Sequence, residues 1–516
     1  METERLDALV VGAGPTGLAM ACELRRRGLR VRVVDAAAEA SRHSKALVVQ
    51  VRSLEVFERM GVLAEVEGRS IAVAELHIMD ADRELAHVKI ANLPGRFAAP
   101  RMLEQSQTEA ILEARLAGLG VQVERATKLV AYREDGDGVL ATVAGPQGES
   151  TIAAAWLLGC DGAHSAVRQL AGIPFEGSVY QDVFEQVDLK IRWQRPQGHG
   201  YGFFRKRGLI VCLPLPRGRH RIMCMGGEHS PGEPTLADFQ RMLDEVSPGA
   251  ELYDPEWIVR FRLHLRMVPR MRERRALLAG DAAHIHSPAG GQGMNTGIQD
   301  AFNLAWKLAL VQRGRATPDL LDSYDHERHT AAAGVLRLSD AFFRRALRGG
   351  TTFRWLRGLM VRTFARRPAV QRRMALTISQ TRVNYREAGT GVDARGWPRP
   401  EPLPGDRAPD APITCPEGQV SLHTRLAAVP WFALVLLGER AGAELRAAGD
   451  AIAARWPELV EVLAAEPTDR ELRRAYAARG DELLLIRPDG HIAARAPLAR
   501  ADAIAGCLER LLGAPA

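Results

Sequence analysis

The chain has 516 residues, of which 46% are hydrophobic and 25% charged, a composition typical of a globular protein with about three domains. Its net charge of +7 is concentrated in an arginine-rich stretch around residues 344–373. There we predict a helical pair with a solvated basic face, the alternative being contact with an anionic ligand or lipid headgroups. No nucleic-acid motif accompanies this stretch, so we expect no nucleic-acid partner. The six cysteines lack paired spacing, and no apolar run reaches roughly 18 residues, so we expect a cytoplasmic protein without a signal peptide or membrane partner.

The segment LDALVVGAGPTGLAMACELRRRGLRVRVVDAA, residues 6–37, predicts a strand, a glycine-rich turn, a helix and a second strand. Gly12 permits a tight turn, Gly14 lets the backbone approach a pyrophosphate, and Gly17 lets the helix pack closely on the strand. Asp35 ends the second strand, where a ribose hydroxyl needs an acceptor. Because strand, turn, helix and acid occur together, we predict a dinucleotide-binding unit rather than a purely structural turn.

Three further stretches contain polar residues beside predicted helices. Lys45 and Arg52 precede a helix in SKALVVQVRSLEVFERMGV, and Gln105 lies at the mouth of another in RMLEQSQTEAILEARL. Asp161 follows an apolar strand in AAAWLLGCDGAHSAVRQLAGI. Each has a structural alternative, and for Asp161 the capping of a strand–turn–helix corner is as reasonable as a ligand role. The last stretch, GDAAHIHSPAGGQGMN at residues 280–295, precedes a strongly apolar helical pattern.

Taken together, GAGPTG with Asp35, GCDGAHSAVR and GDAAHIHSPAGGQGMNTGIQDAFNLAWKLA make the chain resemble the flavoprotein aromatic hydroxylases of the p-hydroxybenzoate hydroxylase fold. The resemblance covers roughly residues 5–390. It implies FAD, NADPH or NADH as electron donor, and molecular oxygen. It also implies hydroxylation of an aromatic substrate through a flavin C4a-hydroperoxide, in a cavity that excludes water.

The resemblance implies an α/β FAD-binding domain that is Rossmann-like, of the glutathione-reductase type, and formed by residues 1–70, 105–176 and 269–397. An inserted α+β substrate domain dominated by a β-sheet would comprise residues 71–104 and 177–268. Six prolines in residues 398–413 indicate a boundary, after which residues 398–516 resemble a thioredoxin-like α/β domain.

Within that last domain, WFALVLLG predicts a buried strand, AELRAAGDAIAARWPELVEVLAA a helix, and DELLLIRPDGHIAAR a hairpin with Asp-Gly at its turn. It has only Cys415 and Cys507, which are far apart, so we expect no thioredoxin-type redox role. We interpret the domain as structural or as a subunit contact, which leaves a homodimer possible.

Carried over motif by motif, the resemblance gives each matched residue a role. The three glycines would hold the pyrophosphate, Asp35 the adenosine ribose, and Asp281 the ribityl chain. Lys45 stands where the family commonly has arginine, which leaves its role open; Lys45 and Pro288 are the candidate flavin-adjacent groups, and no catalytic residue is assigned. Backbone N–H groups at residues 293–295 would face the flavin N1 and C2 carbonyl. The cofactor-binding residues expected in this way are Gly12, Gly14, Pro15, Thr16, Gly17, Asp35, Lys45, Arg52, Gln105, Asp161, Gly280, Asp281, Pro288, Gly291, Gly293, Met294 and Asn295.

Alternating apolar residues in 177–268 predict a sheet, whose side chains Phe203, Phe204, Met223 and Met225 could line a substrate pocket. Ordinary core packing is the favoured alternative for all four. His284 and His286 lack a third ligand at recognisable spacing, so we expect a hydrogen-bonding or packing role and no metal.

The predicted substrate is a polycyclic phenol of polyketide or antibiotic type. The alternatives are a small phenol such as a phenylpropionate, inactivation of an antibiotic, another class of flavoenzyme, and a catalytically silent flavoprotein that binds a reactive intermediate.

Overall fold

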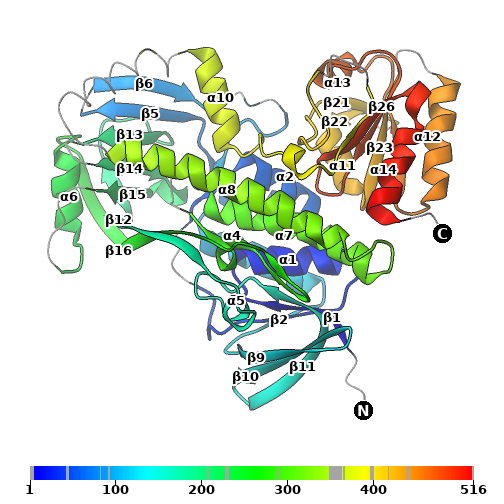
Figure 1. Cartoon of the computed structure of the whole chain (residues 1–516). Helices are drawn as coiled ribbons and strands as arrows, with labels where there is room; N and C mark the ends of the chain where they lie inside the picture. Colours follow the sequence, from blue (N-terminus) through cyan, green and yellow to red (C-terminus); the bar gives the residue numbers. More distant parts are fainter. Residues whose placement is uncertain are drawn as a thin grey trace.

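The computed structural model describes residues 5–41, 46–81, 83–90, 93, 95–205, 208–226, 232–286, 290–347, 363, 367–395, 400–416, 418–438 and 442–513. Lys45, Pro288 and most of the arginine-rich stretch lie outside these residues. Figure 1 shows three units: a sheet near the N-terminus, a second sheet that carries α6, and a C-terminal unit, with the long helix α8 crossing between them. Within the described ranges, no helix has the length and apolar character needed to cross a membrane.

The first sheet contains the βαβ unit expected from the sequence. Its strands run in the order β17-β18-β11-β1-β2-β8, with β9 and β10 attached to β11 as an antiparallel extension. The central strands β1, β2, β11 and β18 are parallel and buried, as is usual where helices cover a sheet. The strands are β1 (Leu6–Val11), β2 (Val31–Val34), β8 (Val123–Glu124), β9 (Lys128–Asp135), β10 (Gly138–Gly145), β11 (Gly148–Gly159), β17 (Arg272–Glu273) and β18 (Ala276–Leu278).

The helices associated with this sheet include α1, which packs against both α4 and α7. Of these, α7 is buried over nearly its whole length, which agrees with the apolar helical pattern after residue 295. The helices are α1 (Pro15–Arg26), α2 (Val51–Met60), α3 (Leu63–Arg69), α4 (Gln105–Gly118), α5 (Ala166–Leu170), α7 (Gly293–Gln312), α8 (Leu320–Leu347) and α10 (Pro368–Ile378), with the short turns η2 (Gly280–Ala282) and η3 (Arg386–Ala388).

The second sheet has eight strands in the order β19-β16-β12-β15-β14-β13-β5-β6. Its edge strand β19 belongs to the GDAAHIHSPAGGQGMN stretch, so this stretch is hydrogen-bonded directly to the second sheet. The elements are β5 (Glu75–Asp80), β6 (Arg83–Lys89), β12 (Glu176–Arg192), β13 (Gly200–Phe204), β14 (Leu209–Pro214), η1 (Pro216–Gly218), β15 (His220–Met225), α6 (Leu236–Asp244), β16 (Glu251–Met267) and β19 (His284–Ile285). A separate small sheet consists of β3 (Val48–Val49), β7 (Arg101–Met102) and β4 (Ile71–Ala72).

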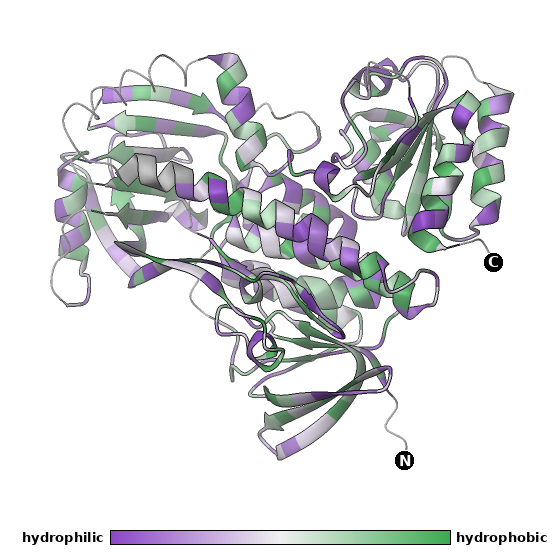
Figure 2. Ribbon diagram, viewed as in Figure 1, coloured by the Kyte–Doolittle hydropathy of each residue, from purple (hydrophilic) through white to green (hydrophobic). Residues whose placement is uncertain are grey.

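The C-terminal unit is built on a sheet of order β20-β26-β25-β23-β24, in which β23 and β24 are parallel and β25 is antiparallel to β23. Figure 2 shows mostly hydrophobic strands here, beside helices that alternate between hydrophilic and hydrophobic residues. The elements are β20 (Val392–Asp393), β21 (Pro412–Cys415), β22 (Gly418–Ser421), α11 (Leu422–Ala428), β23 (Phe432–Leu437), α12 (Ala443–Arg455), β24 (Val460–Ala464), α13 (Arg470–Ala475), β25 (Glu482–Ile486), β26 (Ile492–Pro497), η4 (Leu498–Arg500) and α14 (Asp502–Leu512).

The predicted strand in WFALVLLG and the Asp-Gly hairpin are confirmed by β23 and by the β25–β26 pair. The prediction of one helix over residues 443–465 is wrong in its second half, because α12 ends at Arg455 and residues 460–464 form β24. Pro457 explains the break, since proline cannot continue a helix and the residue before it is driven towards extended backbone.

Burial of an unpartnered histidine makes the second sheet sensitive to acid. His220 is 2% exposed, and neither ring nitrogen has a hydrogen-bond partner among the described residues. Burial lowers the pKa of His220 to about 4, so the folded state favours the neutral ring. Below the ordinary histidine pKa of about 6.5, the unfolded chain binds a proton that the folded chain does not, and this stabilisation is lost as pH falls.

We therefore expect the free energy of unfolding to fall as the pH is lowered from 7 to 5, and His220 to contribute about 2 kcal/mol of this loss. Urea unfolding at several pH values measures it. His220→Phe should reduce the pH dependence by that amount, whereas the exposed His326→Phe should leave it unchanged. Equal pH dependence of the two variants would contradict the assignment.

Candidate active site

Two glycines of the first loop are required by the fold itself. Gly12 has φ +101°, and a Cβ there would lie 2.4 Å from the carbonyl oxygen of Cys160. A Cβ on Gly17 would lie 1.9 Å from the carbonyl oxygen of Gly12. These positions agree with the tight-turn and close-packing roles expected from the spacing.

Gly14 and Gly293 are different, because nothing in the described fold demands glycine there. Gly14 has an ordinary φ of −75°, Gly293 lies in the first turn of α7, and a Cβ at either position would meet no atom within 4 Å. The two residues stand at the N-termini of α1 and α7. An open space beside two helix N-termini suits a ligand that needs close backbone approach and accepts hydrogen bonds.

The carboxylate of Asp35 is hydrogen-bonded to the backbone of the first loop. Its Oδ2 accepts a hydrogen bond from the backbone N–H of Ala13 at 2.5 Å, and its Oδ1 accepts one from Ala37 at 2.8 Å. The carboxylate thus fixes the backbone of the loop at the end of β2, in the position where the ribose role was expected. Thr16 packs tightly against the third motif, because a Cβ on Gly280 would lie 2.5 Å from its Oγ1.

In the second motif, Asp161 has the capping role considered from the sequence. Its Oδ2 accepts hydrogen bonds from the N–H groups of Ala166 (2.7 Å) and Val167 (3.2 Å), while Ser165 caps α5. Burial raises the pKa of the Asp161 carboxyl. Its other oxygen, Oδ1, is buried without a hydrogen-bond partner among the described residues, so capping does not use the whole carboxylate.

The third motif is organised around Asp300 of α7. Its Oδ2 accepts hydrogen bonds from the N–H of Gly280 (3.0 Å) and from Nε2 of His284 (2.7 Å), and its Oδ1 accepts one from Arg328 (2.7 Å). Burial alone would raise the pKa of Asp300, but His284 and Arg328 hold it below its usual value. Asp281, next to Gly280, is exposed beside this buried cluster.

The hydrogen bonds of Asp300 extend to two histidines. Nε2 of His284 is bonded to Asp300, and Nδ1 of His284 lies 3.0 Å from Nε2 of His286. Burial lowers the pKa of His286 to about 3, so this ring is neutral, and its second ring nitrogen is Nδ1. That atom has no partner among the described residues. Both histidines therefore have hydrogen-bonding roles, as the sequence indicated.

The first turn of α7 is held by side chains that the motif analysis did not single out. The side-chain amide of Asn295 accepts from the N–H of Gln50 and donates to the carbonyls of Val48 and Gly291, at 2.7–2.8 Å. Gln50 also donates to the Gly290 carbonyl at 2.7 Å. The first intrahelical bond of this turn runs from Thr296 N–H to the Gln292 carbonyl, so the N–H groups of residues 293–295 have no hydrogen-bond partner within the part of the chain that the structure describes. Met294 is half-buried at the same turn.

Arg52 was expected to precede a helix and to bind the cofactor; the structure corrects its position, and the cofactor role stays a prediction. It lies inside α2 rather than before it, and it is almost fully buried. Its guanidinium donates to Glu55 (2.7 Å) and to the Asp489 carbonyl of the C-terminal unit. A buried guanidinium needs such partners, and the nearby C-terminal unit supplies them. Gln105 does begin α4, where it accepts from the Ala46 N–H at 3.2 Å.

The expected substrate residues divide between the two faces of the second sheet. Phe204, Met223 and Met225 lie together on one face in an apolar cluster with Phe184. Phe203 is fully buried in the opposite core, which includes Phe239 of α6, so grouping it with the other three was wrong. The physical reason is that successive strand residues point to opposite faces.

The face that carries Phe204 is the one directed to the third motif. Leu213 lies on this face at the other end of β14, where it packs in a cluster with Val48. A Cβ on Gly291 would lie 2.7 Å from the Cβ of Val48. Leu213 and Val48 thus connect the Phe204 face to the loop of the third motif.

A buried ion pair on the same sheet had no signal in the motifs. Arg221 and Asp188 are direct cross-strand partners on β15 and β12 and form two parallel hydrogen bonds of 2.7 Å. The pair holds these strands in register beside the apolar cluster. Neither residue belongs to a recognisable motif, so only the pairing of distant strands reveals them.

These features fit FAD: two open glycine positions at helix N-termini, free first-turn N–H groups, an exposed Asp281 and a buried carboxylate oxygen on Asp161. The FAD binding domain family matches residues 5–339, and the C-terminal domain family of aromatic-ring hydroxylases matches residues 401–515. The chain therefore belongs to the FAD-binding aromatic-ring hydroxylases, the class A flavin monooxygenases. It is a flavin-dependent aromatic monooxygenase that binds FAD, in a class that typically uses NAD(P)H.

Named relatives cover almost the whole chain. A 12-dehydrotetracycline 5-monooxygenase/anhydrotetracycline 6-monooxygenase of Streptomyces rimosus is 34% identical over 99% of this chain and 100% of its own. A pentachlorophenol 4-monooxygenase of Sphingobium chlorophenolicum is 32% identical over 98% of this chain and 96% of its own. The solved structure of an anhydrotetracycline hydroxylase from Streptomyces rimosus superposes with a TM-score of 0.81 at 32% identity, covering 99% of this chain and 100% of that chain.

We expect Gly293→Val to weaken FAD binding at least tenfold without unfolding the protein, because its side chain enters the open space at the start of α7. FAD titration of the apoprotein, together with its thermal midpoint, measures both effects. Gly334→Val is the matched control, since Gly334 is a helical glycine of α8 whose Cβ also meets nothing within 4 Å. Equal FAD affinity in the two variants would contradict the placement.

Proposed function

We propose that this monooxygenase hydroxylates a polycyclic phenol of the polyketide type. The observation that carries the proposal is the apolar face with Phe204, Met223 and Met225, which packs through Leu213 and Val48 towards the loop of the third motif. Similarity to monooxygenases named for tetracycline intermediates supports a multi-ring substrate. A broad apolar face is suited to a fused-ring substrate, since such a ligand buries a large flat surface.

In the proposed site, the α1 N-terminus and Gly14 bind the FAD pyrophosphate, and Asp35 accepts from the adenosine ribose. Asp281 accepts from the ribityl chain, with Gln105 contacting the cofactor from the start of α4 and Asp161 from the turn after β11. When bound and reduced, FAD would react with molecular oxygen. This reaction would supply the one oxygen atom that enters the aromatic ring. Pro288 and Lys45 stay predictions, since both lie outside the described residues.

The protein's own contribution to the reaction is electrostatic and steric. The free N–H groups of residues 293–295 and the positive end of the α7 dipole favour negative charge beside the first turn of that helix. The Phe204 face excludes water and orients the substrate ring. The hydrogen-bonded series Asp300–His284–His286 holds the loop of the third motif.

We further propose that the C-terminal unit is thioredoxin-like and structural. A parallel β23–β24 pair joined by α12, followed by the antiparallel β25–β26 hairpin and α14, is the order that such a domain has. Cys507 is buried in α14, and burial raises the pKa of its thiol to about 11, which opposes thiolate chemistry.

The second candidate is a small phenol, which the similarity to a pentachlorophenol 4-monooxygenase favours. NAD(P)H oxidation by the FAD-loaded enzyme, measured over a panel of one-ring and fused-ring phenols with ¹⁸O₂, separates the two. We expect at least tenfold stimulation by fused-ring phenols, with one labelled atom in the product. Stimulation by one-ring phenols alone would favour the second candidate. Tight ligand binding without stimulated oxidation would contradict hydroxylation and favour a binding protein.

Substitutions of the adjacent residues Phe204 and Phe203 test which face of the second sheet binds the substrate. Phe204→Ala should lower kcat/KM for the preferred phenol about tenfold or more, because it removes apolar contact with the ring. Phe203→Ala should instead lower the unfolding free energy by about 3–5 kcal/mol, because it leaves a cavity in a core where Phe203 is fully buried. Steady-state kinetics and urea unfolding of both variants measure this. A larger kinetic effect at Phe203 would reverse the assignment of faces.

A further inference from the structure

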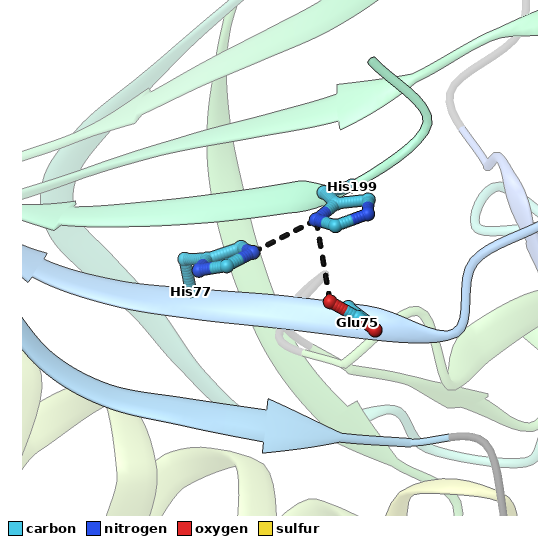
Figure 3. Close-up of side chains that lie close together, drawn as sticks. All are labelled: Glu75, His77 and His199. Carbon is cyan, nitrogen blue, oxygen red and sulfur yellow. Dashed lines mark hydrogen bonds and ion pairs between the residues drawn. The ribbon is translucent and has the colours of Figure 1, made fainter. Parts of the chain in front are cut away.

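Three histidines and two glutamates gather at the edge of the second sheet farthest from the third motif. Glu75 and His77 lie on β5, His87 lies opposite His77 on β6, and His199 directly precedes β13. Figure 3 shows His77 and His199 meeting through ring nitrogens, with Glu75 beside them. The cluster shares its face with Tyr201, whose ring stacks on His77, so it lies on the α6 side of the sheet and not on the Phe204 face.

Three of these side chains have the spacing of a metal site. Nε2 of His77 lies 2.9 Å from Nδ1 of His199, which lies 3.5 Å from Oε2 of Glu75. The three ligand atoms all lie within 4.8 Å of one another. A tetrahedral Zn²⁺ with bonds of about 2.0–2.1 Å places its ligand atoms about 3.3 Å apart, between the two measured separations.

The surrounding hydrogen bonds match those that support metal ligands. Nδ1 of His77 is 2.7 Å from Glu84, which leaves Nε2 of the neutral ring unprotonated and available to an ion. Oε2 of Glu75 accepts from Nε2 of His87 at 2.8 Å. Without an ion, Nδ1 of His199 donates to Nε2 of His77. When an ion binds, this hydrogen leaves Nδ1 and the neutral ring carries its proton on Nε2. Nδ1 of His199 then becomes a ligand.

The second possible set, His77 with Glu84 and His87, has poorer geometry. The rings of His77 and His87 stack face to face, with centroids 4.5 Å apart and planes inclined by 14°. The rings of His77 and His199 are nearly parallel too, inclined by 8° with centroids 5.1 Å apart, but unlike the stacked pair they meet through ring nitrogens 2.9 Å apart. The alternative to any metal is a hydrogen-bonded surface cluster, in which Lys89, opposite Glu75, balances part of the acidic charge.

We propose that Glu75, His77 and His199 bind a divalent transition-metal ion, with Zn²⁺ as the first candidate and water in the fourth position. Two imidazoles and one carboxylate suit Zn²⁺, Co²⁺ or Ni²⁺ better than Mg²⁺ or Ca²⁺. Side-chain exposures of 30%, 12% and 28% leave the site accessible from solvent.

The ion would join β5 to β13, which are 122 residues apart at His77 and His199, and so would stabilise the sheet. The site lies on the α6 side of the sheet, opposite the Phe204 face, so the ion would not contact a substrate bound on that face.

The test uses the FAD-loaded full chain, stripped with EDTA and titrated calorimetrically with ZnCl₂. We expect one ion per chain with micromolar or tighter affinity, weakened at least tenfold by Glu75→Gln and by His199→Gln. His326→Gln, at an exposed histidine of α8, is the matched control and should bind as the unmodified protein does. Zn²⁺ should raise the thermal midpoint of the unmodified protein but not that of His199→Gln.

X-ray absorption at the zinc edge of the unmodified protein keeps the proposal testable if a variant fails to fold. Four nitrogen or oxygen ligands at about 2.0–2.1 Å, with imidazole scattering, are expected. Absence of stoichiometric binding, six oxygen ligands, or equal affinity in Glu75→Gln, His199→Gln and His326→Gln would each overturn the proposal.

Discussion

The buried carboxylate of Asp300 is the interaction on which the active-site region depends. It joins the turn at Gly280, the histidine of β19 and Arg328 of α8 through hydrogen bonds of 2.7–3.0 Å. Breaking such a buried group from its partners is costly, because the remaining charge has no water to solvate it. One side chain of α7 thereby fixes the loop of the third motif relative to both large sheets.

The same network continues into the C-terminal unit. Arg328 donates to the Tyr385 hydroxyl at 3.1 Å, and the ring of Tyr385 lies 4.1 Å from that of His491. In parallel, Glu327 accepts two hydrogen bonds from Arg487 at 2.6 and 2.8 Å. The C-terminal unit is thus joined to α8 by buried charges, which supports the structural role proposed for it.

The sequence predicted those elements of the fold that short segments determine by themselves. The βαβ unit, the helix at Gln105 and the Asp-Gly hairpin were all predictable, because glycine spacing, apolar runs and turn residues specify them within short segments. The helix expected over residues 443–465 failed at Pro457, where proline chemistry should have outweighed the apparent helical period.

The rest of the site depends on contacts between distant segments. Gln50 meets Asn295 across 245 positions, and Arg52 meets Asp489 across 437. Neither contact leaves a pattern in sequence, and the partner of Arg52 could not be predicted because it lies in another unit. Asp300 was visible within the third motif, but only the fold shows that it organises the loop.

The two faces of the second sheet differ in how deeply their side chains are buried. The α6 face contains a core in which Phe203 is fully buried, whereas Phe204 and Met223 on the other face are only partly buried. Substitution on the partly buried face costs less stability, because fewer contacts are lost and no closed cavity forms. Residues that shape a substrate pocket can therefore change there while the opposite core keeps the strands in place. This separation is a physical reason why chains about a third identical, named for substrates as different as a tetracycline intermediate and pentachlorophenol, can share one architecture.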